Sequence, residues 1–440
     1  MAAHTQRQMH LGVFVQAAGH HVSGWRIPGA QYGGENLSLL QHIASTAERG
    51  LFDLFFLADG LSTSADAHPS MIVRFEPLTL LSALAMTTRH IGLAATVSTT
   101  YGAPYHTARM FASLDHLSNG RAAWNVVTTS YDRSAANFGK TPHPDHDKRY
   151  EIAKEFVSVC KGLWDSWDDG AFIADQDSGL FAKPGSMHTL NHDGPHFSVR
   201  GPLNVSRTPQ GHPVLIQAGS SPAGQSLAAE LADIVFTAQD TLESAQKYYT
   251  SITTLAKKNK RRVVVMPGIF PIVGRTEAEA DASYTRLRAL TDMESAYALL
   301  SERLGCDARQ FDPDQPLPAN LPISNALRSR ADLLRDLAER DKLTLRDLAL
   351  HVGMARGHRI VKGTATTIAD TLQEWFENGA ADGFNIMPPW FPGQFDDFVD
   401  LVVPELQRRG LFRHSYHGHT LRDLLGLERP DNSFTSKHSD

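Results

Sequence analysis

Leu114-Asp115-His116-Leu117-Ser118-Asn119-Gly120-Arg121, followed shortly by Asn125-Val126-Val127-Thr128-Thr129, is the stretch of sequence that decides the fold. The pattern predicts a helix that ends at Gly120 and a strand that begins within a residue or two. This strand ends in polar side chains. In a (β/α)8 barrel, the carboxyl ends of the strands are where functional groups are assembled. The stretch therefore predicts one βα unit of such a barrel, with functional side chains at its far end.

The rest of the chain repeats this alternation of short apolar runs and longer helical patterns. The expected strands are residues 10–16, 52–58, 91–98, 122–128, 213–218, 233–237, 263–273 and 383–387. The expected helices are residues 37–49, 77–88, 107–117, 147–164, 224–232, 242–258, 367–377 and 395–409. Eight parallel strands are the number that closes a barrel. We therefore expect an α/β fold, a TIM (β/α)8 barrel formed as a single domain by residues 1–440.

Two segments interrupt the alternation. Residues 167–212 are rich in Gly, Pro, His and Asp, which predicts a long loop or a small β excursion. Residues 290–358 have a helical pattern with a proline-rich interruption at 312–322. Insertions of this length usually serve as functional lids or subunit contacts. We expect them to lie over the carboxyl-terminal face of the barrel.

The C-terminal tail, residues 410–440, contains three closely spaced histidines at His414, His417 and His419. A mobile polar tail or a partner contact is the favoured interpretation of such a segment. Metal binding by the cluster stays open as the alternative.

The composition is that of an ordinary soluble globular protein, with 42% hydrophobic and 20% charged residues. A formal net charge of -6 gives no reason to expect nucleic acid or an anionic membrane as partner. Residues 1–8 lack an apolar signal core, and no run is long enough to span a membrane, so we expect a cytoplasmic protein. Of the two cysteines, Cys160 falls on the apolar face of an expected helix, which predicts a buried, reduced thiol.

Polar residues follow the second and third expected strands. Asp59 comes directly after an apolar strand and precedes Gly60, so its carboxylate is expected at the barrel mouth, with a loop cap as the alternative. Thr96 and Ser98 alternate along the third strand, which predicts that both hydroxyls face that mouth. Threonine is also a common strand residue, so this signal is weak alone.

Two further groups of residues predict a phosphate or sugar site. His146 and Tyr150 lie one turn apart near a helix start, where they can donate hydrogen bonds; surface packing is the alternative. A metal site would need more ligands, and HExxH is absent, so none is expected. In Gln217-Ala218-Gly219-Ser220-Ser221-Pro222, a strand ends and two serines precede a helix start, which suits a phosphate. A plain cap by Ser221 is the alternative, and both can hold together.

Dinucleotide-binding patterns are missing from the chain. No GxGxxG follows a strand, and no P-loop occurs. The sequence thus predicts a site for a mononucleotide phosphate and no dedicated NAD domain.

Seven short motifs occur in order between His10 and about Leu427. They are Gly24-Trp25-Arg26, Arg74-Phe75-Glu76-Pro77, Asn125-Val126-Val127-Thr128, Arg149-Tyr150-Glu151, Gly201-Pro202-Leu203-Asn204, Gln217-Ala218-Gly219-Ser220-Ser221 and Thr420-Leu421-Arg422-Asp423. Together they resemble the bacterial luciferase-like flavin monooxygenases. The resemblance is to the branch with nitrilotriacetate, EDTA and dibenzothiophene-sulfone monooxygenases and enzymes that cleave S-substituted cysteines.

The resemblance implies a two-component monooxygenase that uses reduced FMN and O2, with the flavin supplied by a separate NAD(P)H:FMN reductase. It implies a barrel whose mouth is covered by an insertion. It places Thr96 and Asn125 beside the isoalloxazine as catalytic residues, in an oxygen pocket that would favour a flavin-N5-peroxide over the C4a form. The cofactor-binding residues that it implies are Asp59, Thr96, Ser98, Asn125, Thr128, His146, Tyr150, Ser220 and Ser221, with His146, Tyr150, Ser220 and Ser221 around the ribityl phosphate.

The expected substrate is a small organosulfur or aminocarboxylate compound, oxygenated with cleavage of a C–S or C–N bond. Arg26, Arg74 and His20 are candidates for binding a carboxylate, although structural salt bridging explains either arginine equally well. By analogy with relatives of the barrel, we expect a homodimer or homotetramer.

Two other functions are compatible with the same barrel. One is a deazaflavin-dependent oxidoreductase that transfers hydride without oxygen. The other is a non-catalytic flavin-binding homologue. The polar residues expected at the mouth favour the FMN monooxygenase over both.

Overall fold

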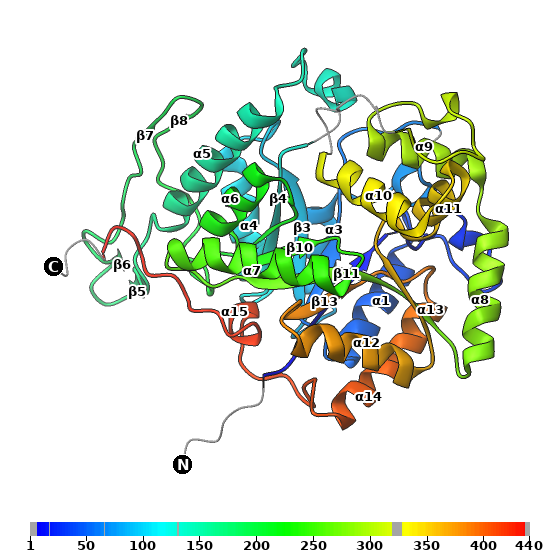
Figure 1. Cartoon of the computed structure of the whole chain (residues 1–440). Helices are drawn as coiled ribbons and strands as arrows, with labels where there is room; N and C mark the ends of the chain where they lie inside the picture. The colour runs from blue at the N-terminus through cyan, green and yellow to red at the C-terminus, as the bar shows by residue number, and fades with distance from the viewer. Residues whose placement is uncertain (1–6, 17, 66, 130–131, 319–327, 436–440) are drawn as a thin grey trace.

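Eight parallel strands form a closed barrel at the centre of the molecule (Figure 1). The computed structural model describes residues 7–16, 18–65, 67–129, 132–318 and 328–435. Each strand pairs in parallel with the next, and the last closes on the first, where His10 lies opposite Gly383. The strands are β1 (His10–Val15), β2 (Leu54–Leu57), β3 (Gly92–Ser98), β4 (Ala122–Val127), β9 (Val214–Gln217), β10 (Ile234–Thr237), β11 (Val264–Val273) and β13 (Gly383–Ile386). The prediction of a TIM barrel is confirmed, and all eight strands fall within two residues of the expected limits.

Helices surround the barrel in the order that the sequence predicts. They are α1 (Leu37–Arg49), α3 (Pro77–Ala85), α4 (Pro104–Leu117), α5 (His146–Trp164), α6 (Pro222–Leu231), α7 (Leu242–Lys258), α12 (Ala365–Glu377), α13 (Gly393–Asp397) and α14 (Val403–Arg408). A side-chain cap starts several of them, for example Asn36 on α1 and Thr241 on α7. The single helix expected at 395–409 is divided by a π-helical turn, Phe398–Val402, before Pro404, because proline has no N–H for the helical ladder.

Alternation along the strands separates the barrel interior from its outer layer. On β4, Ala123 packs inside the barrel, whereas Trp124 packs outside against Phe111 and Phe156. Larger side chains fill the interior below the mouth, where the rings of Phe14 and Phe56 meet at 4.9 Å between centroids. The barrel is therefore a packed core, and any ligand space lies at its end.

The C-terminal segment closes the opposite end of the barrel. Leu421, in α15 (Leu421–Leu424), and Leu425 join the interior cluster with Leu54 and Val214. Arg422 is buried and its Nη2 lies 3.0 Å from the Asp233 carboxylate. The prediction of a mobile tail is wrong for residues 413–435, because this apolar pair and buried ion pair anchor the segment.

The first insertion, residues 167–212, forms two small hairpins, which is the β excursion of the two alternatives predicted for it. They are β5–β6 (Phe172–Asp175, Leu180–Ala182) and β7–β8 (His192–Asp193, Ser198–Val199). In Figure 1 these hairpins and the helices of the second insertion lie on opposite sides of the barrel.

The second insertion is helical and has a core of its own. Its helices are α8 (Glu277–Leu290), α9 (Met293–Leu304), α10 (Arg328–Asp341) and α11 (Leu345–Ala355), and Leu300, Leu334 and Leu348 pack between them. It starts earlier than expected, with α8, and returns through β12 (Arg359–Gly363), a ninth strand that pairs with the far end of β11. β12 was not predicted, because five residues with charged neighbours give too short an apolar run. Of the expected proline-rich interruption, residues 319–322 lie outside the described ranges.

The cysteine prediction is confirmed. Cys160 is fully buried and free, its Sγ lies 3.4 Å from the Pro104 carbonyl oxygen, and burial raises the pKa of its thiol well above the usual range. Across the described residues, no helix combines the length and apolarity needed to cross a bilayer. The cytoplasmic location stays a prediction.

Candidate functional site

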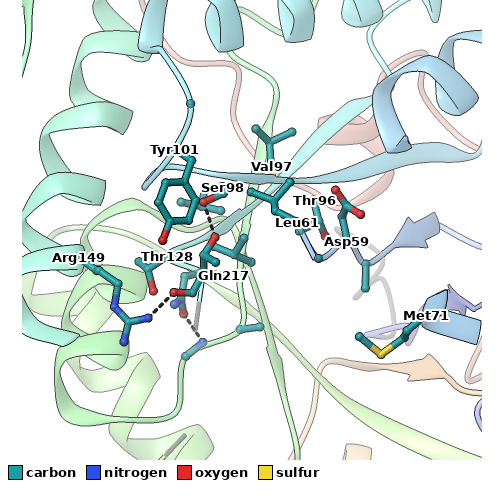
Figure 2. A pocket seen from close by; sticks show the side chains of 18 of the residues that line it. Asp59, Leu61, Met71, Thr96, Val97, Ser98, Tyr101, Thr128, Arg149 and Gln217 are labelled. Atoms are coloured by element: carbon teal, nitrogen blue, oxygen red, sulfur yellow. Dashed lines mark hydrogen bonds between the residues drawn. The ribbon is translucent and has the colours of Figure 1, made fainter. Parts of the chain in front are cut away.

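A cavity of about 440 Å³ opens at the carboxyl ends of the strands (Figure 2). Its walls come from the ends of β1 to β4, β9 and β10, from the starts of α5 and α6, and from the second insertion. Among the predicted site residues, those that line it are Asp59, Arg74, Thr96, Ser98, Thr128, His146, Tyr150, Ser220 and Ser221. The structure thus brings together residues that are up to 162 positions apart, from Asp59 to Ser221.

Thr96 and Asn125 form a buried hydrogen-bonded pair beneath the mouth. Asn125 Nδ2 donates to Thr96 Oγ1 at 2.8 Å, and that hydroxyl donates to the Leu57 carbonyl oxygen at 2.7 Å. The side chain of Asn125 does not line the cavity itself. Its Oδ1 is buried and has no hydrogen-bond partner among the described residues. An unsatisfied acceptor of this kind costs folding free energy, and a donor from a ligand or water would remove that cost.

The third strand also supplies hydroxyls to the wall. Ser98 Oγ lies 2.5 Å from Thr129 Oγ1, so these two groups hold the ends of β3 and β4 together. Thr100 Oγ1 donates to the Thr128 carbonyl oxygen at 2.7 Å, which orients the backbone at the rim. The alternation predicted for Thr96 and Ser98 is therefore found, although both hydroxyls also serve the barrel itself.

Asp59 and Arg74 form an ion pair in the wall, with 3.0 Å between Asp59 Oδ1 and Arg74 Nε. Arg74 Nη2 also donates to the Gly60 carbonyl oxygen at 2.6 Å. Burial raises the pKa of the Asp59 carboxyl, and the neighbouring guanidinium opposes that shift. The structural salt bridge that the sequence left open for Arg74 is thus present, within the cavity wall.

The start of α6 is built as the serine motif predicts. Ser221 Oγ accepts a hydrogen bond from Gly224 N at 3.1 Å, and Pro222 occupies the first helical position. Ser220 Oγ lies 3.3 Å from Thr237 Oγ1. A Cβ on Gly219 would lie 2.9 Å from Gly224 Cα, so only glycine permits this approach of strand and helix. Ser221 is therefore a helix cap, and its hydroxyl hydrogen remains available to an acceptor in the cavity.

The start of α5 presents a second wall to the same end of the cavity. The rings of His146 and Tyr150 lie 4.8 Å apart, one turn apart on the helix. Arg149 is buried and donates through Nη1 to the Thr129 carbonyl oxygen and, at 2.9 Å, to His143 Nε2.

His143 links that arginine to an aromatic side chain. Since arginine only donates, His143 Nε2 is the acceptor, and Nδ1 donates to Tyr101 Oη at 2.5 Å. Burial and the Arg149 charge lower the pKa of His143, which keeps it neutral in this role. Figure 2 shows Tyr101 and Arg149 close together at this end of the pocket.

Two candidates for substrate binding lie away from the cavity. Arg26 is exposed and donates to the Leu290 carbonyl oxygen at 3.2 Å, which ties its loop to α8. His20 is fully buried, donates to the Phe14 carbonyl oxygen at 2.8 Å, and packs edge-on against the Phe14 ring. Burial lowers the pKa of His20 to about 3. The structure brings neither side chain into the described cavity wall, because each bonds to nearby backbone.

Several lining residues were missed by the sequence analysis. Gln16 and Gln217 lie at the carboxyl ends of strands, and this position alone could have identified them as candidate site residues. Three arginines come from the second insertion, namely Arg303, Arg330 and Arg356. Their positions on charged helices gave no local signal, because only tertiary packing brings them to the mouth.

The residues present fit a flavin mononucleotide. Hydroxyls, a buried arginine and a helix N-terminus converge at one end, as a phosphate requires. Toward the barrel, Gln16 Oε1 and Asn125 Oδ1 are buried acceptors without partners among the described residues, a match for the N–H groups of a flavin ring. No group of three or more His, Cys, Asp or Glu side chains in the described part of the chain is placed to hold a metal.

Comparison with known proteins gives a consistent result over nearly the whole chain. Residues 9–382 match the family model described as luciferase-like monooxygenase. The chain is 51% identical to N-acetyl-S-(2-succino)cysteine monooxygenase of Bacillus subtilis (strain 168), covering 98% of this chain and 99% of the relative. It is 47% identical to nitrilotriacetate monooxygenase component A of Aminobacter aminovorans, covering 97% and 98%. The crystal structure of a riboflavin lyase with modified FMN and riboflavin superposes with a TM-score of 0.87 at 30% identity, covering 96% of each chain.

Proposed function

This chain belongs to the luciferase-like monooxygenase family and is a flavin-dependent monooxygenase, and from that premise we propose that it uses reduced FMN and O2 to oxygenate a small carboxylated thioether or amine. The observation that carries the proposal is the cavity itself. One end of it gathers hydroxyls and Arg149, which would suit a phosphate, and two buried acceptors, Gln16 Oε1 and Asn125 Oδ1, lie toward the barrel. That combination suits a mononucleotide with a polar ring system.

The residues divide into two groups by what they would do. At the phosphate end, Ser220, Ser221 and Tyr150 would donate hydrogen bonds, and Arg149 would supply positive charge. At the ring end, Thr96 and Asn125 would position the isoalloxazine.

Bound reduced FMN supplies the reaction with dioxygen, which protein side chains cannot perform alone. The protein's own task is placement and exclusion of water. The packed barrel interior below the mouth and the helical insertion beside it would keep solvent from the ring.

The substrate class follows from chemistry shared by two relatives. One is named for an S-substituted cysteine and the other for nitrilotriacetate, and both compounds are carboxylates with a central sulfur or nitrogen. Oxygenation next to such an atom would give a product that breaks a C–S or C–N bond. We propose the same class for this chain.

A separate NAD(P)H:FMN reductase would supply the reduced flavin. The chain has no dinucleotide fingerprint of its own, and its relative from Aminobacter aminovorans is named as component A of its system. A homodimer or homotetramer remains part of the proposal.

The test is an oxygen-labelling experiment. The protein, an FMN reductase, NADH and ¹⁸O₂ would be incubated with N-acetyl-S-(2-succino)cysteine or nitrilotriacetate. We expect one labelled oxygen atom in the product and no turnover when reduced deazaflavin replaces reduced FMN. Product without label would overturn the monooxygenase proposal, and turnover with deazaflavin alone would favour hydride transfer. Flavin binding without turnover of any such compound would favour the non-catalytic homologue.

A further inference from the structure

The charge of the cavity is opposite to that of the chain. Among the described residues that line it, five are arginines and two carry carboxylates, whereas the whole chain has a formal net charge of -6. The two carboxylates are already engaged. Asp59 pairs with Arg74, and Glu76 accepts from Leu78 N at 2.9 Å and Thr79 N at 2.7 Å, at the start of α3. The cavity is therefore built for anionic ligands.

The arginines lie in two separate places. Arg149 belongs to the end formed by α5 and α6. Arg356 Nη2 lies 3.7 Å from Met71 Sδ. Figure 2 shows Arg149 and Met71 at opposite sides of the pocket, so Arg356 lies across the cavity from Arg149. The flavin phosphate would bind near Arg149. The arginines on the opposite side of the cavity would then bind a second anionic group.

Three insertion helices supply the second group. Arg303 lies near the end of α9, Arg330 in α10, and Arg356 directly after α11. Arg303 and Arg356 are 9% and 8% exposed, so both charges are largely removed from water. Placing guanidinium groups in such an environment costs free energy unless anions or well-placed acceptors accompany them.

The described neighbours of this group include a histidine and a glutamate. Arg330 Nη2 lies 3.1 Å from His358 Nε2, and burial together with nearby arginines lowers the pKa of His358 well below its usual value. Arg303 Nη1 is 3.7 Å from Glu302 Oε1, a longer contact than a hydrogen bond. Arg303 Nε is buried and has no hydrogen-bond partner among the described residues.

We infer that Arg303, Arg330 and Arg356 form a carboxylate-binding subsite that makes the enzyme specific for polyanionic substrates. The guanidinium fork matches the two oxygens of a carboxylate and can bind them with parallel hydrogen bonds. The subsite lies on the insertion, not on the barrel, so specificity would be set apart from the cofactor. This inference rests on the proposed function for the identity of the reacting compound, and on the structure alone for the anion site.

The test compares substrate binding with flavin binding in matched variants. Arg303→Gln, Arg356→Gln and their double variant would be titrated calorimetrically, without flavin, with N-acetyl-S-(2-succino)cysteine. Steady-state oxygenation of this compound and of its methyl esters would be measured alongside. Arg288→Gln is the control, because Arg288 is an insertion arginine outside this cavity that pairs with Asp347 on the surface.

We expect each single variant to raise the dissociation constant and KM of the carboxylate about 10-fold or more, and the double variant about 100-fold. FMN affinity, the KM of the esters and the Arg288→Gln values should stay at wild-type levels. Unchanged carboxylate affinity in folded variants that retain wild-type FMN affinity would overturn the subsite. If no compound is oxygenated but the variants still lose carboxylate binding, the proposed function fails and the subsite stands.

Discussion

The two ends of the cavity differ in the groups that they offer to an anion. At the α5–α6 end, the cavity is lined by hydroxyls, a helix N-terminus and Arg149, which is hydrogen-bonded to His143. All of these groups belong to the barrel. At the opposite end, three guanidinium groups come from helices inserted between β11 and β12. On the proposed function, the barrel would carry the site for a shared cofactor, whereas the insertion would carry the charge that selects a substrate. A change at one end should therefore leave binding at the other end intact.

The largest effect on FMN affinity is expected for substitution of Arg149, which lies at the α5–α6 end of the cavity. On the proposed function, Arg149→Met would remove a charge-assisted hydrogen bond to the phosphate, which is worth about 1.5–3 kcal/mol, or about 10- to 150-fold in FMN affinity. Fluorescence titration with FMN measures this loss. Arg303→Met serves as the control and should keep wild-type FMN affinity. Equal losses in both variants would mean that the two ends are not independent.

Ser221 tests whether a helix cap also binds the phosphate. Ser221→Ala should weaken FMN binding by on the order of 1–3 kcal/mol. It should also lower the free energy of unfolding by about 1 kcal/mol, because the cap of α6 is lost. Thr276→Ala is matched to it, since Thr276 caps α8 through Glu279 N outside the cavity. If both variants lose stability equally and neither loses FMN affinity at low phosphate, Ser221 is a cap alone.

The buried His20 should make the stability of the fold depend on pH. Burial lowers the pKa of His20 to about 3, so the folded state keeps it neutral while the unfolded state takes up a proton near pH 6.5. Its contribution is complete above about pH 6.5 and is lost as the pH falls from there toward 3, by up to about 1.4 kcal/mol per pH unit. His20→Gln should show a shallower loss of unfolding free energy in urea between pH 7 and 5. Parallel slopes for the two proteins would contradict this assignment.

Substitution of Asn125 should have the smallest effect on FMN affinity and a clear effect on the coupling of NADH consumption to product formation. Asn125→Ala removes a buried acceptor at the ring end and leaves the phosphate contacts intact. FMN affinity is expected to fall by only about 0.5–1.5 kcal/mol, the net value of one neutral hydrogen bond. The ratio of NADH consumed to product formed should rise, because less of the oxygen reaches the substrate. A ratio equal to wild type would remove Asn125 from the reaction.

Much of the barrel could be predicted because its signals are local. A strand end, a turn and a helix start follow one another within a few residues, from Gln217 through Gly219 and Ser220 to Ser221. The structure shows each of these three features. The same holds for Asp59 after β2 and for Thr96 on β3. Local chemistry decides these positions, so local sequence reveals them.

The parts that could not be predicted depend on tertiary packing. Arg303 lies near the end of α9 and Arg356 directly after α11, where the local sequence gives no functional signal, and only the fold of the insertion brings them to the barrel mouth. Leu421 and Leu425 form a short apolar pair in a polar tail, and only the open lower end of the barrel explains their burial. Arg26 was a candidate because it belongs to a family motif, but its hydrogen bond to the Leu290 carbonyl oxygen holds its side chain outside the cavity.

The most direct test of the account is a crystal structure of the protein with FMN and N-acetyl-S-(2-succino)cysteine. The account predicts the phosphate between Ser221 and Arg149, the ring above Thr96 and Asn125, and the substrate carboxylates against Arg303 and Arg356. A flavin bound in the reverse direction, with its phosphate among the insertion arginines, would contradict it.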